Sequence, residues 1–123
     1  MYDPRYLAGI VLFNRGDFFE AHEVWEDVWL ETVGHERLLL QGLIQIAAGY
    51  LKAESGNHGA TIKLLSKGSN LVRQFLPRAL GLELEPFLQA VAADLAAAQQ
   101  MQPITFTADR LLMPVIERSR EEA

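Results

Sequence analysis

Glycines and prolines divide this chain into five segments of helical length. Asp3 and Pro4 make a good helix opening, because Asp can cap a helix and Pro is tolerated at its first position. Gly16, Gly34 and Gly56 each follow a segment with helical spacing of apolar residues, and glycine readily adopts the left-handed conformation that ends a helix. We therefore expect helices at about residues 4–14 or 15, 17–32, 36–55, 58–75 and 85–100.

Local signals near the helix ends support this division. Asp17 with Glu20 three residues later is close to a capping box, Asn57 can cap the fourth helix, and Pro77 follows its end. Residues 81 and 82 belong to a turn. No segment shows sustained period-two alternation, so we expect no sheet. The prediction is an all-α, up-and-down helical bundle of about five helices.

The pattern changes after residue 100. The β-branched and aromatic run 104–107 predicts extended chain, and the charged run 117–123 predicts a frayed end. We interpret residues 101–123 as a C-terminal strap that docks Phe106 and Leu111 onto a bundle formed by residues 1–100. Since there is no internal repeat and no long linker, we expect a single helical domain over residues 1–123.

Composition narrows the classes of function. The chain has 123 residues, of which half are apolar, and it has no cysteine, so disulfides, thiolate metal sites and thiol nucleophiles are excluded. The net charge of −5, with scattered Lys and Arg, disfavours nucleic-acid binding. No signal peptide is evident, and the apolar run 38–51 is too short and too interrupted to span a membrane. We expect a cytoplasmic protein without a cofactor.

The most informative segment is Phe13 to Glu31, which contains both Trp and three of the six Phe of the chain. These are Phe13, Phe18, Phe19, Trp25 and Trp29. On a helical wheel, two apolar strips run along the second predicted helix, and His22 and Glu26 fall between them. The two residues are four apart and hence neighbours on the helix surface. We therefore expect a partly buried polar pair.

The third predicted helix supplies possible partners for this pair. Gln41 and Gln45 share one stripe of a helix that is otherwise apolar nearly all round, which predicts buried amides that need hydrogen-bond partners. Gly42 and Gly49 lie beside that stripe and permit close approach of another helix. The simplest arrangement packs the second helix against the third, with one network formed by His22, Glu26, Gln41 and Gln45.

The stretch from Phe13 to Glu26, with Trp29 following, resembles the signature of the DUF309 family. Residues 41–49 resemble the second block of that family, and residues 56–60 resemble its third, so the resemblance covers about residues 6–76. It implies a small helical bundle but no particular activity, because the family has no assigned function. The family's motif maps onto Phe18, Glu20, His22, Glu23, Trp25, Glu26, Trp29, Gln41, Gly42 and Gln45.

Two enzymatic readings of the pair stay open as alternatives. The sequence from His22 to Glu26 has the form H-E-x-x-E, whereas a zinc protease helix has H-E-x-x-H. A third metal ligand would have to come from elsewhere, and His35 and His58 both lie near predicted helix ends. We therefore predict no metal site. His22 could instead act as a general base oriented by Glu26, although no motif supplies a nucleophile.

We favour a non-catalytic helical domain with a groove between its first three helices that binds a partner segment or a small ligand, in a homodimer. The expected groove residues are Glu20, His22, Glu23, Trp25, Glu26, Trp29, Gln41 and Gln45. The alternative is a metal-assisted or His–Glu acid/base enzyme, hydrolase-like, acting on a small substrate, with His22 and Glu26 as catalytic candidates. The acidic side chains of the second helix predict a solvated face, with a basic partner surface as the less favoured reading.

Overall fold

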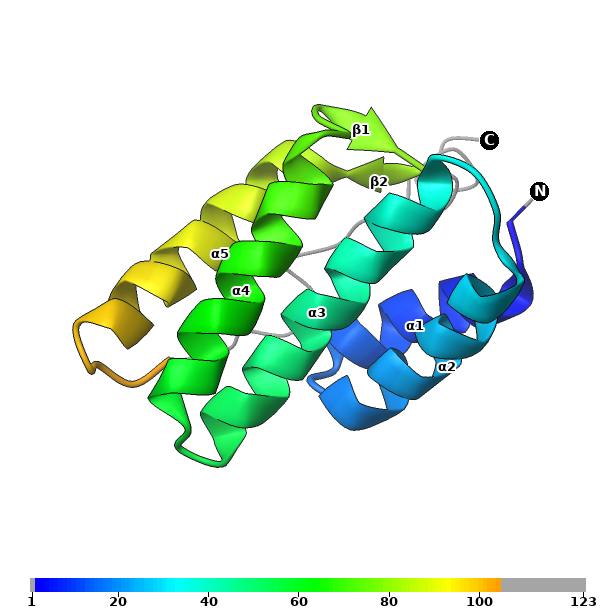
Figure 1. The fold of residues 1–123 in the computed structure, drawn as a ribbon. Coiled ribbons are helices and arrows are strands. Elements are labelled where there is room, and N and C mark those ends of the chain that lie inside the picture. The colour runs from blue at the N-terminus through cyan, green and yellow to red at the C-terminus, as the bar shows by residue number, and fades with distance from the viewer. Residues whose placement is uncertain (1, 105–123) are drawn as a thin grey trace.

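The computed structural model describes residues 2–104, which form five helices and one short hairpin (Figure 1). The five predicted helices are all present, with ends within two residues of those expected. In chain order the elements are α1 (Pro4–Asn14), α2 (Phe18–Glu31), α3 (Glu36–Glu54), α4 (His58–Arg73), β1 (Arg78–Ala79), β2 (Leu82–Glu83) and α5 (Leu84–Gln99).

Two of the three predicted caps form. The Asp3 carboxylate accepts a hydrogen bond from the backbone N–H of Arg5 at 2.8 Å, and the Asn57 amide oxygen accepts one from Ala60 at 3.1 Å. Asp17 occupies the N-cap position of α2, but its side chain makes no capping hydrogen bond, so the predicted capping box is wrong. The expected glycine stops are confirmed after α1 and α3, by positive φ angles of 86° at residue 16 and 77° at residue 56. Gly34 also has a positive φ of 88°, but α2 ends earlier, at Glu31, where Thr32 adopts an extended backbone.

The prediction of no sheet is wrong, because β1 and β2 pair antiparallel through two residues each. Leu80 and Gly81 connect them with φ angles of 49° and 76°, which is the geometry of a tight two-residue hairpin turn. Strands this short contain no alternation that a sequence pattern could reveal. Leu82 is buried, and the Tyr6 hydroxyl donates a hydrogen bond to the carbonyl of Leu80 at 2.8 Å, so the hairpin is tied to α1.

Consecutive helices pack against one another, which confirms the up-and-down bundle (Figure 1). The backbones of α3 and α4 approach each other closely: a Cβ placed on Gly42 would lie 2.9 Å from the carbonyl oxygen of Gly68, and one placed on Gly68 would lie 2.7 Å from that of Gly42. The predicted close approach at Gly42 therefore occurs, and its partner is α4.

Among the helices of residues 2–104, none combines the length and the hydropathy that a membrane span requires.

An aromatic cluster centred on Phe13 joins α1 to three other helices. The ring of Phe13 is fully buried, and its centroid lies 5.4 Å from that of Phe18, 5.8 Å from Trp25, 5.9 Å from Tyr50 and 5.8 Å from Phe87. Tilted and edge-to-face contacts at such distances are the favoured arrangements of aromatic rings. Much of the predicted aromatic segment is therefore core.

A buried carboxylate adds a polar tie between α3 and α5. Asp94 is buried, and its carboxylate accepts a hydrogen bond from the Tyr50 hydroxyl at 2.5 Å. Such a partner offsets the cost of removing a carboxylate from water. Nothing in the alanine-rich sequence around Asp94 indicates this contact, because it joins residues 44 positions apart.

The predicted C-terminal strap is described only at its start. Ile104 is partly buried and packs against the core. Phe106 and Leu111, the two residues expected to dock onto the bundle, lie outside the described residues.

Substituting Gly9→Ala should destabilise the fold, because a Cβ at this position would clash with the indole ring of the fully buried Trp25. Overpacking of this kind costs about 1–3 kcal/mol of unfolding free energy. Urea denaturation would measure this loss of unfolding free energy. The matched control is Gly59→Ala, where the new Cβ would come no closer than 3.9 Å to a neighbour and helix propensity should add up to about 1 kcal/mol. Equal effects of the two substitutions would contradict this packing.

Candidate functional site

The predicted pair on α2 is present but more exposed than expected. Nε2 of His22 lies 3.2 Å from a carboxylate oxygen of Glu26, and the two side chains are 28% and 48% exposed. Glu26 is therefore not a buried carboxylate. The physical reason is that one of the two apolar strips expected to flank the pair, formed by Phe19 and Leu30, faces solvent.

Trp25 is a core residue and cannot line a groove, which corrects its predicted role. Its side chain has no exposed surface, and its Nε1 donates a hydrogen bond to the backbone carbonyl of Tyr6 at 3.1 Å. A buried indole N–H normally needs such a partner. Trp25 therefore holds α2 against α1.

Trp29 is partly buried and is covered by a residue that sequence reasoning missed. The guanidinium carbon of Arg37 lies 3.6 Å from the ring centroid of Trp29, and Nε of Arg37 donates a hydrogen bond to the Trp29 carbonyl at 3.3 Å. This is a cation–π contact reinforced by a hydrogen bond. It spans the turn between α2 and α3, so no spacing within one helix could indicate it.

The predicted network with the glutamines does not form. Gln41 and Gln45 are partly buried on α3, and no hydrogen bond among the described residues joins either of them to the His22–Glu26 pair. The amide oxygen of Gln45, Nδ1 of His22 and Nε1 of Trp29 are buried and have no hydrogen-bond partner within residues 2–104. The reason lies in the orientation of α3. Gly42, three residues before Gln45 and on the same side of the helix, packs on α4, so this side turns away from α2.

The metal-assisted alternative has no donor set in the part of the chain that the structure describes. No group of three His, Asp or Glu side chains there could hold a metal ion. The ring of His35 packs on Phe75 with centroids 4.7 Å apart, and His58 begins α4. Neither histidine joins His22 and Glu26 in a group that could bind a metal.

The outer face of α2 carries an exposed stripe, which we call the α2 stripe. It consists of Phe19, His22, Glu26 and Leu30, whose spacing of three or four residues places them along one side of a helix. Phe19 is 53% exposed and Leu30 is 70% exposed, and the ring of Phe19 lies 6.4 Å from that of His22. Val33, in the turn just beyond, is 88% exposed.

Carboxylates border the α2 stripe on one side. Glu20, Glu23 and Asp27 are exposed, as predicted for a solvated acidic face, and α2 contains no Lys or Arg. On the far side of these carboxylates lies a shallow groove of about 330 Å³, whose apolar lining is Leu12 from α1 and Val24 from α2. The solvent side of α2 thus combines exposed apolar side chains with concentrated negative charge.

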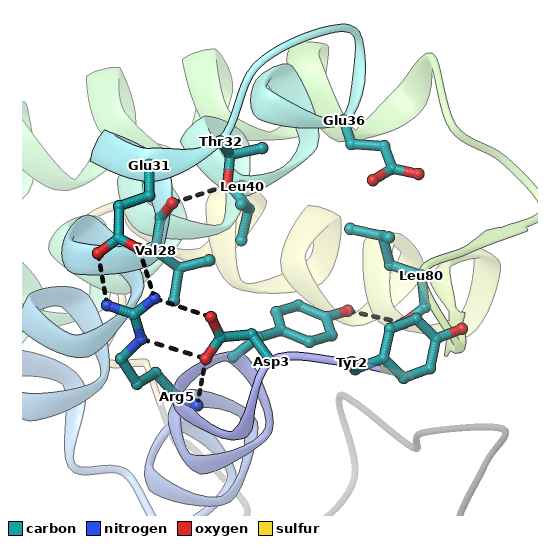
Figure 2. Close-up of a pocket in the computed structure, with 10 residues that line it drawn as sticks. Tyr2, Asp3, Arg5, Val28, Glu31, Thr32, Glu36, Leu40 and Leu80 are labelled. Atoms are coloured by element: carbon teal, nitrogen blue, oxygen red, sulfur yellow. Dashed lines mark hydrogen bonds and ion pairs between the residues drawn. The ribbon is translucent and has the colours of Figure 1, made fainter.

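A charged cluster ties the end of α2 to the start of α1 (Figure 2). The Arg5 guanidinium donates to both carboxylate oxygens of Glu31, at 2.7 and 3.0 Å, and to both of Asp3, at 3.1 and 2.8 Å. These hydrogen bonds hold the pKa of the Glu31 and Asp3 carboxyl groups below their ordinary values of 4.5 and 3.8, and they raise the pKa of Arg5. Sequence reasoning placed Glu31 on the acidic face but missed Arg5, because 26 residues separate them.

Residues 6–64 match the family described as "Domain of unknown function (DUF309)". This match confirms the predicted resemblance over α1, α2, α3 and the start of α4. No curated protein matches the chain.

Replacing Gln45→Met should leave stability unchanged or raise it by about 1 kcal/mol, because the substitution removes a buried oxygen that has no hydrogen-bond partner among the described residues. Gln41→Met serves as the control, since Gln41 has no such orphaned atom and a change within about 0.5 kcal/mol is expected. Chemical denaturation measures both variants. A loss of about 1 kcal/mol or more in Gln45→Met alone would mean that the amide belongs to a polar network after all.

The Arg5 cluster should make stability depend on acidity. Since Asp3 and Glu31 have lowered pKa values in the folded chain, their contribution is present above their unfolded values of 3.8 and 4.5 and is lost as the pH falls below them. Between pH 6 and pH 2.5, the melting temperature of the Arg5→Met variant should therefore fall less than that of the unsubstituted chain. Arg73→Met should keep the slope of the unsubstituted chain, because within residues 2–104 this exposed arginine donates its side-chain hydrogen bond to the neutral Asn70 and not to a carboxylate. Identical slopes for all three proteins would refute the role of the cluster.

Proposed function

We propose that this chain, whose residues 6–64 match the DUF309 family, is a non-catalytic helical domain that binds a basic amphipathic partner segment on the outer face of α2. The observation that carries the proposal is the α2 stripe, with Phe19 and Leu30 exposed beside a row of carboxylates. The surface includes His22 and Glu26 of the predicted groove and excludes Trp25.

The apolar part of the stripe supports binding. Single exposed apolar residues are ordinary, but Phe19 and Leu30 lie on one side of one helix, with Val33 just beyond them. Covering their surface would be favourable by about 25 cal/mol per Å². A partner helix with apolar residues at a spacing of three, four and seven fits such a stripe, because this spacing presents one continuous apolar side.

The charge of α2 supports a basic partner rather than a second copy of the chain. Glu20, Glu23 and Asp27 lie next to the stripe with no Lys or Arg on the helix to balance them. Pairing two α2 helices would bring these like charges together, whereas Lys and Arg side chains of a partner would complement them. The stems of such side chains can lie in the groove over Leu12 and Val24 while their charged ends reach the carboxylates. We expect a homodimer to use another face. Both the homodimer and the cytoplasmic location stay predictions.

The geometry of His22 favours a binding role over acid/base catalysis. A general base needs a ring nitrogen that can reach a proton of the substrate. Nδ1 of His22 is buried, and Nε2 is engaged with Glu26 at 3.2 Å. Together with the missing metal donor set among residues 2–104, this makes the enzymatic alternative the weaker proposal.

Fluorescence anisotropy with a labelled peptide can test the proposal. The probe is an 18-residue designed helix with Leu on one face and Lys on its flanks, and its counterpart carries Glu in place of every Lys. We expect the Lys peptide to bind more weakly as salt increases, and the Glu peptide not to bind. The double substitution Phe19→Ser and Leu30→Ser should weaken binding by roughly tenfold or more, since it removes two apolar contacts.

Two controls separate the surface from the fold. Val11→Ser changes an exposed apolar residue on α1 and should leave binding intact. Glu26→Gln should alter the unfolding free energy by no more than about 0.5 kcal/mol, as expected for an exposed ion pair, while weakening binding of the Lys peptide. Equal binding of the Glu and Lys peptides, or equal losses in the Val11 and Phe19/Leu30 variants, would overturn the proposal.

A further inference from the structure

A second hollow lies at the end of the bundle where four elements meet (Figure 2). It is a cavity of about 290 Å³ between the start of α1, the end of α2, the start of α3 and the hairpin turn. Val28, Leu40 and Leu80 line it with apolar surface, and Val28 and Leu40 are themselves core residues. The apolar wall of the cavity is therefore part of the core.

The charges around this cavity are unequal. Three carboxylates, those of Asp3, Glu31 and Glu36, line it with a single cation, Arg5. Arg5 is bound by both Asp3 and Glu31, so its charge is already compensated. Glu36 has no hydrogen bond or ion pair within residues 2–104, and its carboxylate lies on the opposite side of the cavity from the Arg5 cluster (Figure 2). An anionic ligand would meet net negative charge, whereas a cationic one would find a free carboxylate.

Two tyrosine rings complete the lining. Tyr2 and Tyr6 have centroids 5.8 Å apart and planes tilted by 57°. The Tyr6 hydroxyl is engaged with the Leu80 carbonyl, so this residue offers its ring and not its hydroxyl to a ligand. Aromatic faces attract cations, and they do so most strongly where water is partly excluded.

We infer that this cavity is a binding site for an alkylammonium group, with Glu36 as the anionic partner, Tyr2 as the aromatic one, and the apolar wall in contact with the alkyl chain. The inference does not rest on the acidic side chains of the cavity alone. It rests on the combination of a walled apolar cavity, a free carboxylate on one side of it and two aromatic rings. A hydrocarbon chain ending in an ammonium group matches all three.

The volume limits the ligand to a small one. A cavity of about 290 Å³ is at the lower end of ligand sites, which suits a chain of four or five carbons better than a larger molecule. Two sources share this chemistry: a free aliphatic amine and the side chain of a lysine in a peptide. The site is distinct from the α2 stripe, since none of the four stripe residues lines the cavity.

The test is a titration of the ¹⁵N-labelled full chain followed by NMR. The probes are 1,5-diaminopentane, lysine blocked at its backbone amine and carboxyl groups, and butyrate as the anionic counterpart. We expect saturable shifts of the amide signals of Tyr2, Thr32 and Glu36 with the two amines and none with butyrate. Tighter binding of the diamine would identify a free amine as the ligand, and equal or tighter binding of blocked lysine would identify a peptide side chain.

Variants make the test specific. Glu36→Gln should weaken amine binding by roughly fivefold or more, because it removes the unpaired charge while keeping the shape of an exposed side chain. Glu85→Gln, an exposed carboxylate at the start of α5, should bind as the unsubstituted chain does. The Phe19→Ser and Leu30→Ser variant should also retain amine binding, so this site and the α2 stripe can fail independently. Unsaturable shifts, equal shifts with butyrate, or full affinity in Glu36→Gln would overturn the inference.

Discussion

The burial of the Phe13 ring is the contact on which the arrangement of this protein depends. Phe13 touches rings from α2, α3 and α5 at once, so it attaches the α1–α2 pair to α3 and α5. Trp25 holds the two helices of this pair together, because it packs over Gly9 and its Nε1 donates a hydrogen bond to the Tyr6 carbonyl. Because these contacts occupy one side of α2, a second side, with Phe19 and Leu30, is left facing solvent.

The motif residues of α2 therefore fall into two groups, which lie on different sides of the helix and have different roles. Phe18 and Trp25 belong to the core, whereas Glu20, Glu23 and Glu26 face solvent. His22 lies at the border, with one ring nitrogen buried and the other beside Glu26. Much of the aromatic part of the motif is explained by packing, so the polar half and its exposed apolar neighbours are where the proposed binding surface lies.

Sequence patterns predicted most of the fold because helix signals are local. The caps at Asp3 and Asn57 and the contact of His22 with Glu26 each involve residues at most four positions apart, and all three are present. The features that were missed join distant positions or are very short. The Arg5–Glu31 pair spans 26 residues, Arg37 covers Trp29 across a turn, and the hairpin has strands of two residues.

The sequence by itself determined where the helices begin and end, which residues share each face, and that His22 and Glu26 are neighbours. Only the tertiary structure decided which face meets a partner. Periodicity assigns two apolar strips to α2, but it cannot tell that the Trp25 strip packs on α1 and the Phe19 strip faces water. It likewise could not tell that the close approach at Gly42 is to α4, so that the Gln45 oxygen finds no partner in the part of the chain that the structure describes. The physical reason is that helical geometry follows from local bonding, whereas burial depends on contacts with residues far along the chain.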